Sequence, residues 1–299
     1  MLNPENIAIA LSASVTWALA LIINKSLAAT VGSLHMNTVR LWAGSAVVAG
    51  FVCVLGKYES PAAYPAIALF LLVASGIVAL AVGDTVFIRS LYYIYVSQAF
   101  PVSQCAFLVM TVLASILFLS ETFTPLNILG GLLILTGLYL VTVYGRQSGV
   151  AGFRTADRKG LTIAFGAAVA WTLAAVILKL ALTEMNAVFA TAIRTFSAAV
   201  VLTIYQGGPW APSPGSPLKR IGIRNLALIA LSGMLGYGIG GIAYVLAMQR
   251  VGAGRTVLIT SLTPVLVLVL SVLFLKERPT RQSVIGTLVC VVGVMCLSM

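Results

Sequence analysis

Long apolar stretches separated by short polar or proline-containing segments recur along the whole chain. Each stretch is continuously apolar and does not alternate with polar positions, which indicates helices in lipid and not the strands of a membrane barrel. A helix needs about 20 apolar residues to cross a bilayer. The pattern therefore predicts ten transmembrane helices, at residues 7–27, 36–55, 64–94, 97–119, 126–145, 160–182, 187–206, 224–248, 255–275 and 282–298.

The composition places the chain in the all-α integral membrane class. Of the 299 residues, 60% are hydrophobic and 8% are charged, whereas soluble domains contain about 25% charged residues. The formal net charge of +11 does not by itself indicate nucleic acid, because Lys and Arg beside transmembrane helices reflect membrane orientation. We therefore expect the protein to lie in a lipid bilayer and not to bind nucleic acid.

The two halves of the chain repeat one another. The segment SVTWALALIINK aligns with AVAWTLAAVILK, so that Trp17 pairs with Trp171 and Lys25 with Lys179 at a separation of 154 residues, and Arg40 pairs with Arg194 at the same separation. Later, LFLSETFT aligns with LFLKERPT. Rare residues that match in one order at a nearly constant separation indicate a duplication. It divides the chain into two five-helix units, residues 1–150 and 151–299.

A unit with five crossings has a geometric consequence. The second copy must enter the membrane from the opposite side, so the halves form an inverted repeat. Secondary transporters commonly have this arrangement, with a substrate site near the middle of the membrane between the two halves. The sequence therefore predicts a central cavity enclosed by both repeats.

These features resemble the EamA branch of the drug/metabolite transporter superfamily. The likeness covers nearly the whole chain and rests on the Trp and Lys of each first span, on LFL-x-E-x-x-T, and on SLTPVLVLVLSVLFLKE at residues 261–277. The first half has Phe107, Leu108 and Val109 where a counterpart of Pro264 is expected. The resemblance implies a secondary transporter that works by alternating access, with cytoplasmic termini. The distribution of Lys and Arg, by contrast, places the termini outside, so the orientation stays open.

Asp84 is the acid most deeply placed within an apolar stretch. It lies in VALAVGDTVFIRSLYY, and its counterpart in the second half is Gly241, so it breaks the repeat. Ionisable residues inside the membrane are costly, which makes them candidates for function. Asp84 is expected either to form a structural ion pair, with Arg89 or another basic group, or to bind a proton or a substrate ammonium group.

Two pairs of basic residues stand at equivalent ends of the first two spans in each half. Lys25 and Lys179 end the first span of their halves, and Arg40 and Arg194 lie in the second. Long basic side chains can reach the membrane surface along their aliphatic stems, so anchoring is one interpretation. The other is that these residues gate the cavity or attract a substrate carboxylate or phosphate.

The two equivalent tryptophans lie near the middle of their spans, away from the interface where Trp usually concentrates. Trp17 and Trp171 either pack between helices or line the cavity with an aromatic face, and Asn24 lies on nearly the same helical face as Trp17. The spans that resemble cavity-lining helices of the family add further polar or amphipathic candidates: Gln98, Ser103, Gln104, Tyr237, Tyr244, Thr260 and Ser261.

Other motifs favour structural roles. Glu121 and Glu277 end their spans at equivalent positions, where a carboxylate is expected to bond neighbouring backbone amides or a basic side chain. The run GYGIGG has the glycine spacing of a dinucleotide loop but lies within an apolar span without a preceding strand. Small residues at helix contacts explain that run, and they also explain the glycine pairs Gly130 with Gly137 and Gly286 with Gly293.

The leading hypothesis is a secondary transporter of a bacterial or archaeal inner membrane that exports small organic metabolites such as amino acids. No phosphate-binding loop of the nucleotide-hydrolysing type is present, so a proton gradient or exchange is expected to drive transport. A sugar-phosphate or nucleotide-sugar antiporter is the alternative within this class. A lipid-modifying membrane enzyme and a passive channel or scramblase are alternatives outside it. We expect no enzymatic activity, no cofactor and no metal, and either a monomer or a homodimer.

Overall fold

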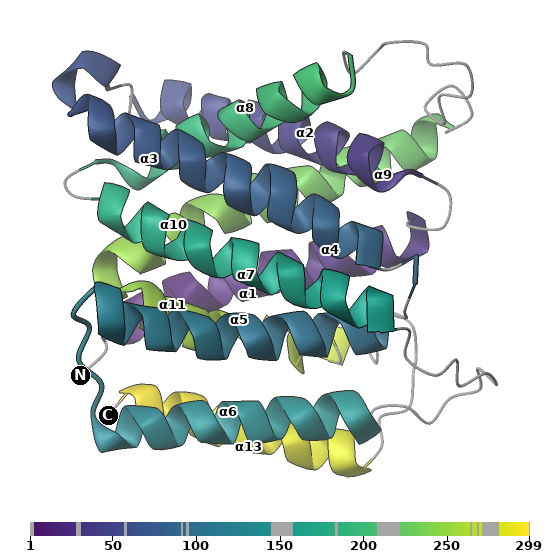
Figure 1. The fold of residues 1–299 in the computed structure, drawn as a ribbon, viewed down its shortest axis with the longest axis vertical. Coiled ribbons are helices and arrows are strands. Elements are labelled where there is room, and N and C mark those ends of the chain that lie inside the picture. The colour runs from purple at the N-terminus through teal and green to yellow at the C-terminus, as the bar shows by residue number, and fades with distance from the viewer. Residues whose placement is uncertain are drawn as a thin grey trace.

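The computed structural model describes residues 3–27, 31–56, 59–90, 92–93, 96–144, 158–182, 185–207, 222–263, 265–267, 269–270 and 281–298. Every regular element in these ranges is a helix. The helices run along one common direction and form a bundle, in which the start of α1 and the end of α13 lie near the same end (Figure 1). The all-helical class predicted from the sequence is confirmed.

The helices follow the same order in both halves. The first half contains α1 (Pro4–Leu27), α2 (Ser33–Val54), the short η1 (Pro61–Ala63), the consecutive α3 (Ala66–Gly76), η2 (Ile77–Gly83) and α4 (Asp84–Ser90), then α5 (Val96–Phe118) and α6 (Pro125–Tyr144). The second half contains α7 (Arg158–Ala181), α8 (Ala187–Tyr205), the consecutive α9 (Ile223–Gly233), η4 (Met234–Ile239) and α10 (Gly240–Val251), then α11 (Ala253–Thr260) and α13 (Arg281–Ser298).

Six helical segments in the described residues are long and apolar enough to cross a membrane. They are Pro4–Asn24, Ser33–Val54, Ala66–Ser90, Arg158–Ala181, Ala187–Tyr205 and Ile223–Val251. The other four predicted spans fall on shorter apolar helices, at Val102–Phe118, Pro125–Leu140, Ala253–Val267 and Val284–Cys296. The membrane class is thus supported, and ten crossings stay a prediction.

The third span of each half contains a π-helical segment at the equivalent place. In η2 the widened turn ends where the amide of Asp84 donates to the carbonyl of Ala79, and in η4 it ends where the amide of Gly240 donates to the carbonyl of Leu235. A π-helical turn inserts one extra residue per turn and is frequent at functional sites. The run GYGIGG belongs to η4 and the start of α10, so it is helical and not a nucleotide-binding loop.

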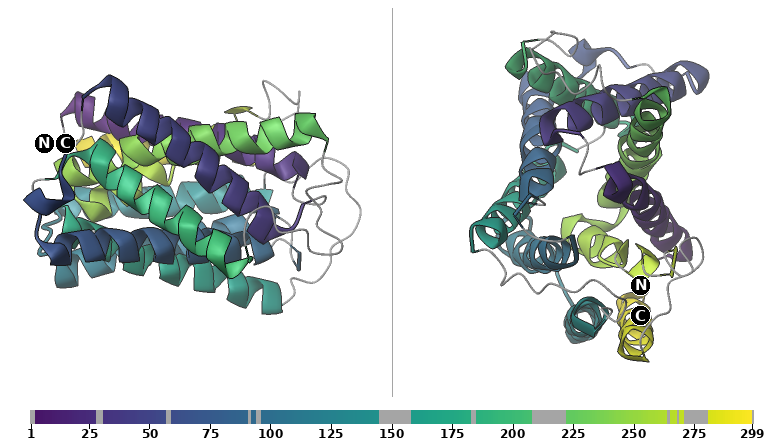
Figure 2. Two further views of the ribbon diagram at one scale, coloured as in Figure 1. Left: turned by 90° about the horizontal axis from the view of Figure 1, so that it is seen from above. Right: turned by 90° about the vertical axis from the view of Figure 1, so that its right-hand side faces the viewer.

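The two halves interlock through exchanged contacts. Helix α1 packs against α9, η4 and α10 of the second half, and α7 packs against α3, η2 and α4 of the first. Helices α2 and α8 contact each other, and α6 and α13 form a separate pair along one edge of the bundle (Figures 1 and 2). The first helix of each repeat therefore packs against the third span of the other repeat, and these contacts between the halves lie at the centre of the bundle.

Equivalent glycines make these close contacts sterically feasible. A Cβ atom on Gly76 would lie 2.5 Å from the carbonyl oxygen of Arg194, and a Cβ atom on Gly233 would collide with the backbone of Arg40. Since Gly76 matches Gly233 and Arg194 matches Arg40, the same backbone contact is built twice. Each contact sets the distance between α2 or α8 and the third span of the opposite half.

Glycines also produce the close pairing of α6 with α13, as the sequence indicated. A Cβ atom on Gly293 would lie 2.7 Å from the carbonyl oxygen of Gly130, and one on Gly137 would lie 2.5 Å from that of Gly286. These positions need glycine because the helices approach backbone to backbone.

Replacing Gly76 with alanine tests the interlocked contact. We expect Gly76→Ala to lower the free energy of unfolding by about 1–3 kcal/mol, because the added methyl group must displace the α8 backbone. Thermal unfolding of the purified protein in detergent measures this. Gly50→Ala is the matched control, because nothing lies within 4 Å of its added Cβ and alanine stabilises a helix by up to about 1 kcal/mol relative to glycine. Equal unfolding temperatures for the two variants would contradict the packing described here.

Candidate functional site

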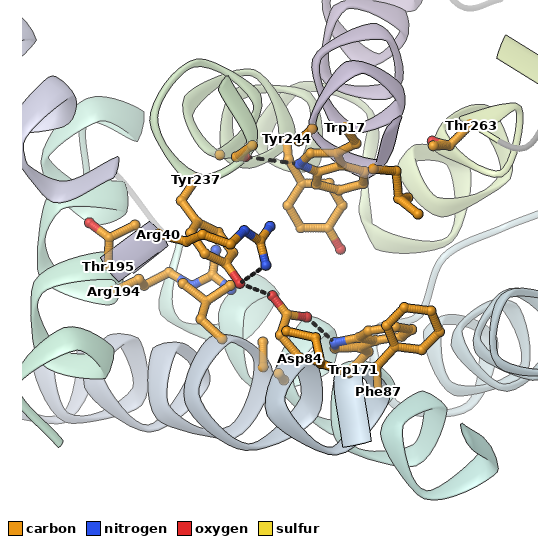
Figure 3. A pocket seen from close by; sticks show the side chains of 18 of the residues that line it. Trp17, Arg40, Asp84, Phe87, Trp171, Arg194, Thr195, Tyr237, Tyr244 and Thr263 are labelled. Atoms are coloured by element: carbon orange, nitrogen blue, oxygen red, sulfur yellow. Dashed lines mark hydrogen bonds between the residues drawn. The ribbon is translucent and has the colours of Figure 1, made fainter. Parts of the chain in front are cut away.

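A cavity of about 200 Å³ lies between the two halves. A single water needs about 10–15 Å³ of such space, so the cavity has room for a small organic molecule. Its wall is mostly apolar and includes six aromatic side chains from both repeats: Trp17, Phe87, Phe107, Trp171, Tyr237 and Tyr244. The predicted central cavity therefore corresponds to a real hollow in the fold, shown in Figure 3.

The two equivalent tryptophans come from α1 and α7 and face each other's half. The ring centroid of Trp17 lies 5.2 Å from that of Tyr244, and the ring centroid of Trp171 lies 5.5 Å from Phe87 and 5.9 Å from Phe107. The Nε1 of Trp17 donates to the carbonyl of Gly236, 3.0 Å away in η4. Both tryptophans thus line the cavity and also link the two halves.

Equivalent glycines leave room for these two rings. A Cβ atom on Gly83 would lie 2.7 Å from the ring of Trp171, and one on Gly240 would lie 2.9 Å from Nε1 of Trp17. Because each indole rests on the third span of the other half, a side chain at either glycine would push the ring out of place.

Asp84 joins the first half to the second. Trp171 Nε1 donates to Asp84 Oδ1 at 2.7 Å, and the Tyr237 hydroxyl hydrogen-bonds with Asp84 Oδ2 at 2.5 Å (Figure 3). The expected alternative of an ion pair with Arg89 is not found among the described residues, and the Arg89 side chain points to the exposed surface. Helix α4 begins at Asp84 just after the π-helical segment, which directs its carboxyl group into the cavity.

Asn37 extends this network. Its Nδ2 donates to the carbonyl of Leu80 at 2.8 Å and to Thr85 Oγ1 at 3.0 Å, while its Oδ1 lies 2.6 Å from the Tyr237 hydroxyl oxygen. Asn37 is completely buried. Asn37 was not among the predicted site residues because its partners, Leu80 and Tyr237, are distant in the sequence. A buried amide in an apolar helix nevertheless requires hydrogen-bond partners and could have marked it.

Arg40 and Arg194 bring two buried guanidinium groups to the cavity. Only 9% of the surface of Arg40 and 5% of the surface of Arg194 is exposed. Arg40 Nη1 donates to the Tyr237 hydroxyl at 3.2 Å and its guanidinium lies 4.5 Å from that ring centroid. Arg194 Nε donates to Ser75 Oγ at 3.0 Å.

Most of the N–H donors of the two arginines are unused by the part of the chain that the structure describes. A guanidinium group carries five N–H donors, and each arginine makes one of the hydrogen bonds named above. The Nε of Arg40 is buried without an acceptor in this part of the chain. The cavity thus holds two cationic groups and one carboxyl group, so it has an excess of positive charge and free donors for an anionic group.

The structure gathers many of the sequence-predicted residues around this cavity and leaves others out. Asn24 and Gln104 line it, together with the residues described above. Ser103, Thr260 and Ser261 are buried but do not line it. The hydroxyls of Thr260 and Ser261 donate to carbonyls one turn earlier in their own helix, because both side chains turn back along α11. The side chains of Lys25 and Gln98 lie outside the described residues.

Lys179 and Glu121 both bond to the backbone outside the cavity. Lys179 Nζ donates to the carbonyl of Met248 at 3.0 Å, near the end of α10. Glu121 accepts hydrogen bonds from the amides of Ala253 and Gly254, at 2.5 Å and 3.1 Å, which gives partners to two of the amides at the buried start of α11. The predicted backbone-bonding role of Glu121 is confirmed, and its counterpart Glu277 lies outside the described residues.

Further lining residues had no polar signal in the sequence. Phe87 and Phe107 are apolar residues in apolar spans, and Thr191 and Thr263 resemble many other small polar residues of the chain. Only the packing of the helices shows that they face inward. No group of three or more His, Cys, Asp or Glu side chains with the geometry for a metal ion occurs in the described residues.

The fold and this cavity define a class of membrane protein: two interlocked helical repeats around a central cavity, as in transporters. The model of the EamA-like transporter family matches residues 6–143 and 158–299, once in each half. The chain therefore belongs to the EamA-like transporter family.

Comparison with solved structures agrees on the fold. A set of 29 solved chains matches. One of them is a crystal structure that is 20% identical in sequence, with a TM-score of 0.76 over 99% of this chain and 98% of its own. At that identity the likeness supports the fold alone. No match was found among curated proteins.

A substitution at Lys179 distinguishes anchoring from gating. We expect Lys179→Met to lose about 1 kcal/mol of stability with the hydrogen bond to Met248, and to bind small-molecule ligands with unchanged affinity because Lys179 does not line the cavity. Thermal unfolding with and without amino acids measures both effects. A folded variant that no longer binds a ligand of the wild-type protein would instead assign Lys179 to the transport path.

Proposed function

We propose that this protein is a secondary transporter that moves small organic metabolites, with amino acids as the leading class, by alternating access. Membership of the EamA-like transporter family supports the transport function. Two halves that enclose one cavity can rock against each other and open it to alternate sides. We further propose that it acts as an exporter in a bacterial or archaeal inner membrane and is driven by a proton gradient or by exchange.

The observation that carries the choice of substrate is the pair of arginines with unused donors in an aromatic cavity. Guanidinium groups bind carboxylates through parallel N–H bonds, so Arg40 and Arg194 suit the carboxylate of an amino acid. The rings of Trp17, Trp171 and Tyr244 suit an apolar or aromatic side chain, because such pockets are mostly apolar with few polar groups that fix orientation.

The carboxyl group of Asp84 supplies the third element of amino-acid recognition. It lines the same cavity as the arginines and is partly accessible from it. An amino acid carries an ammonium group beside its carboxylate, so a site with two cations and one carboxyl group matches both of its charges. A simple organic anion would use the arginines alone.

A sugar phosphate is the second candidate within the transporter class. Its phosphate would use the same two arginines, since these groups also bind phosphate. Its hydroxyl groups would need several more donors and acceptors, whereas the cavity wall is mostly apolar. Amino acids fit this wall better, and the test below includes both classes.

Removing one guanidinium group tests the proposal. We expect Arg194→Gln to weaken phenylalanine and leucine binding by about ten- to hundredfold, because a hydrogen bond to a charged group contributes about 1.5–3 kcal/mol and each 1.4 kcal/mol is about tenfold in affinity. Ligand-induced thermal stabilisation measures it. Arg250→Gln is the matched control, since Arg250 pairs with Glu5 on the surface and should leave binding unchanged. Stabilisation of the wild type by glucose 6-phosphate and not by either amino acid would instead show that the site binds phosphorylated substrates.

A further inference from the structure

The Tyr237 hydroxyl group has one proton but two close acceptor oxygens. Its oxygen lies 2.5 Å from Asp84 Oδ2 and 2.6 Å from Asn37 Oδ1. Oxygen atoms approach this closely only when a proton lies between them. Arg40 Nη1 also donates to the same hydroxyl oxygen, at 3.2 Å, and so cannot supply a proton to either of the other two contacts.

The orientation of the Asn37 amide group removes the first alternative. If the amide were turned over, its Nδ2 could donate to Tyr237, but its Oδ1 would then face the carbonyl oxygen of Leu80 at 2.8 Å. A backbone carbonyl can only accept hydrogen bonds, so Nδ2 must face Leu80. The Asn37 oxygen therefore faces Tyr237 and needs the hydroxyl proton.

The second proton must then come from Asp84. With a protonated carboxyl group, Asp84 donates to the Tyr237 oxygen and Tyr237 donates to Asn37, so every short contact contains a proton. An ionised Asp84 would compete with Asn37 for one proton and leave one of the two contacts without any. We propose that Asp84 carries a proton in this conformation and that the ammonium group of an amino-acid substrate displaces it; the displacement rests on the function proposed above.

The charged and titratable groups around Asp84 come from every helix packed against it. Arg40 of α2 and Arg194 of α8 act on it electrostatically, Tyr237 and Tyr244 come from η4 and α10, and Trp171 of α7 is a neutral donor. On its own helix, Arg89 points to the exposed surface. The positive charge of the two arginines is thus not neutralised while Asp84 holds its proton.

Exchange of the proton for an amino acid lowers this excess charge. The amino acid is a zwitterion and adds no net charge. When its ammonium group pairs with the Asp84 carboxylate, the O–H bond of the carboxyl group breaks and the proton passes to water on the side to which the cavity is open. Proton and substrate then share one carboxyl group and cannot occupy it together, which is the requirement for antiport.

The shared carboxyl group is also one of the links between the halves. Its two oxygens bond Trp171 and Tyr237, both of the second half, whereas Asn37 and Asp84 belong to the first. Loss of the proton removes one hydrogen bond of the bridge from Asn37 through Tyr237 to Asp84. Proton release therefore changes the contact across which the two halves must move.

Infrared spectroscopy tests the proton without knowledge of the substrate. At about pH 6 a water-exposed aspartate is ionised, so a C=O stretch of a protonated carboxylic acid reports a carboxyl group that keeps its proton. We expect this band in the wild type, its loss in Asp84→Asn, and its retention in Glu5→Gln, which removes a surface acid paired with Arg250. Absence of the band in the wild type, or its persistence in Asp84→Asn, would overturn the proposal.

The Asp84→Asn variant is expected to fold. An asparagine at position 84 can donate to Tyr237 and accept from Trp171, as the protonated acid does. Tyr237→Phe provides a second check, because it removes the hydroxyl partner and keeps the ring over Arg40; we expect the acid band to shift in frequency. An unshifted band in Tyr237→Phe would place the protonated carboxyl group elsewhere.

Proton release on ligand binding tests the exchange. In weakly buffered solution with a pH indicator dye, phenylalanine should release one proton per molecule bound to the wild type and none from Asp84→Asn. The matched probe is 3-phenylpropionate, which lacks the ammonium group and should bind without release. Phenylalanine binding without release, or equal release with both probes, would overturn the exchange. If neither probe binds, both the exchange and the proposed function fail, while the infrared band still decides whether Asp84 holds a proton.

Discussion

The carboxyl group of Asp84 connects the parts of the site through its hydrogen bonds to the opposite repeat. A carboxyl group within the membrane is costly unless the protein supplies partners for it. Those partners, Trp171 and Tyr237, come from the opposite repeat. The same two side chains form part of the cavity wall, and Tyr237 also accepts a hydrogen bond from Arg40. Binding surface, charge balance and the contact between the halves are therefore properties of one network.

Around this network the architecture is nearly symmetric. Gly76 and Gly233 admit the backbones of the opposite arginines, and Gly83 and Gly240 admit the opposite indoles. A glycine at both members of each pair shows that the duplicated unit forms the same close contacts in both halves. Asp84 has no such counterpart, because the equivalent Gly241 has no side chain. The asymmetry thus lies in the chemistry of the cavity and not in its framework.

The framework was largely predictable from the sequence because it depends on periodicity and rare residues. Trp17 matches Trp171 and Arg40 matches Arg194 at one separation, which was enough to indicate inverted halves and a cavity between them. A backbone-bonding role for Glu121 was predictable because this acid ends its span, but its partners were not, since Ala253 and Gly254 belong to the other half.

The inward face of each helix was less accessible to sequence reasoning. The π-helical segments of the third spans shift the angular position of every later residue, so a regular helical wheel fails beyond Ile77 and Met234. Asn37 was overlooked because its partners, Leu80 and Tyr237, are distant in sequence. Thr260 and Ser261 resemble cavity residues by type, yet their hydroxyls bond to their own helix, an option open to any helical Ser or Thr.

In the proposed transporter a small metabolite occupies one cavity that opens to either side in turn. Counterflow in proteoliposomes tests it most directly: vesicles are loaded with excess unlabelled phenylalanine and placed in a trace of labelled phenylalanine at equal pH on both sides. A carrier should accumulate label inside, transiently above the outside concentration, because each outward step of unlabelled substrate returns the cavity for a labelled molecule. Label that only equilibrates, as through a channel, or that does not enter would exclude alternating access to this cavity.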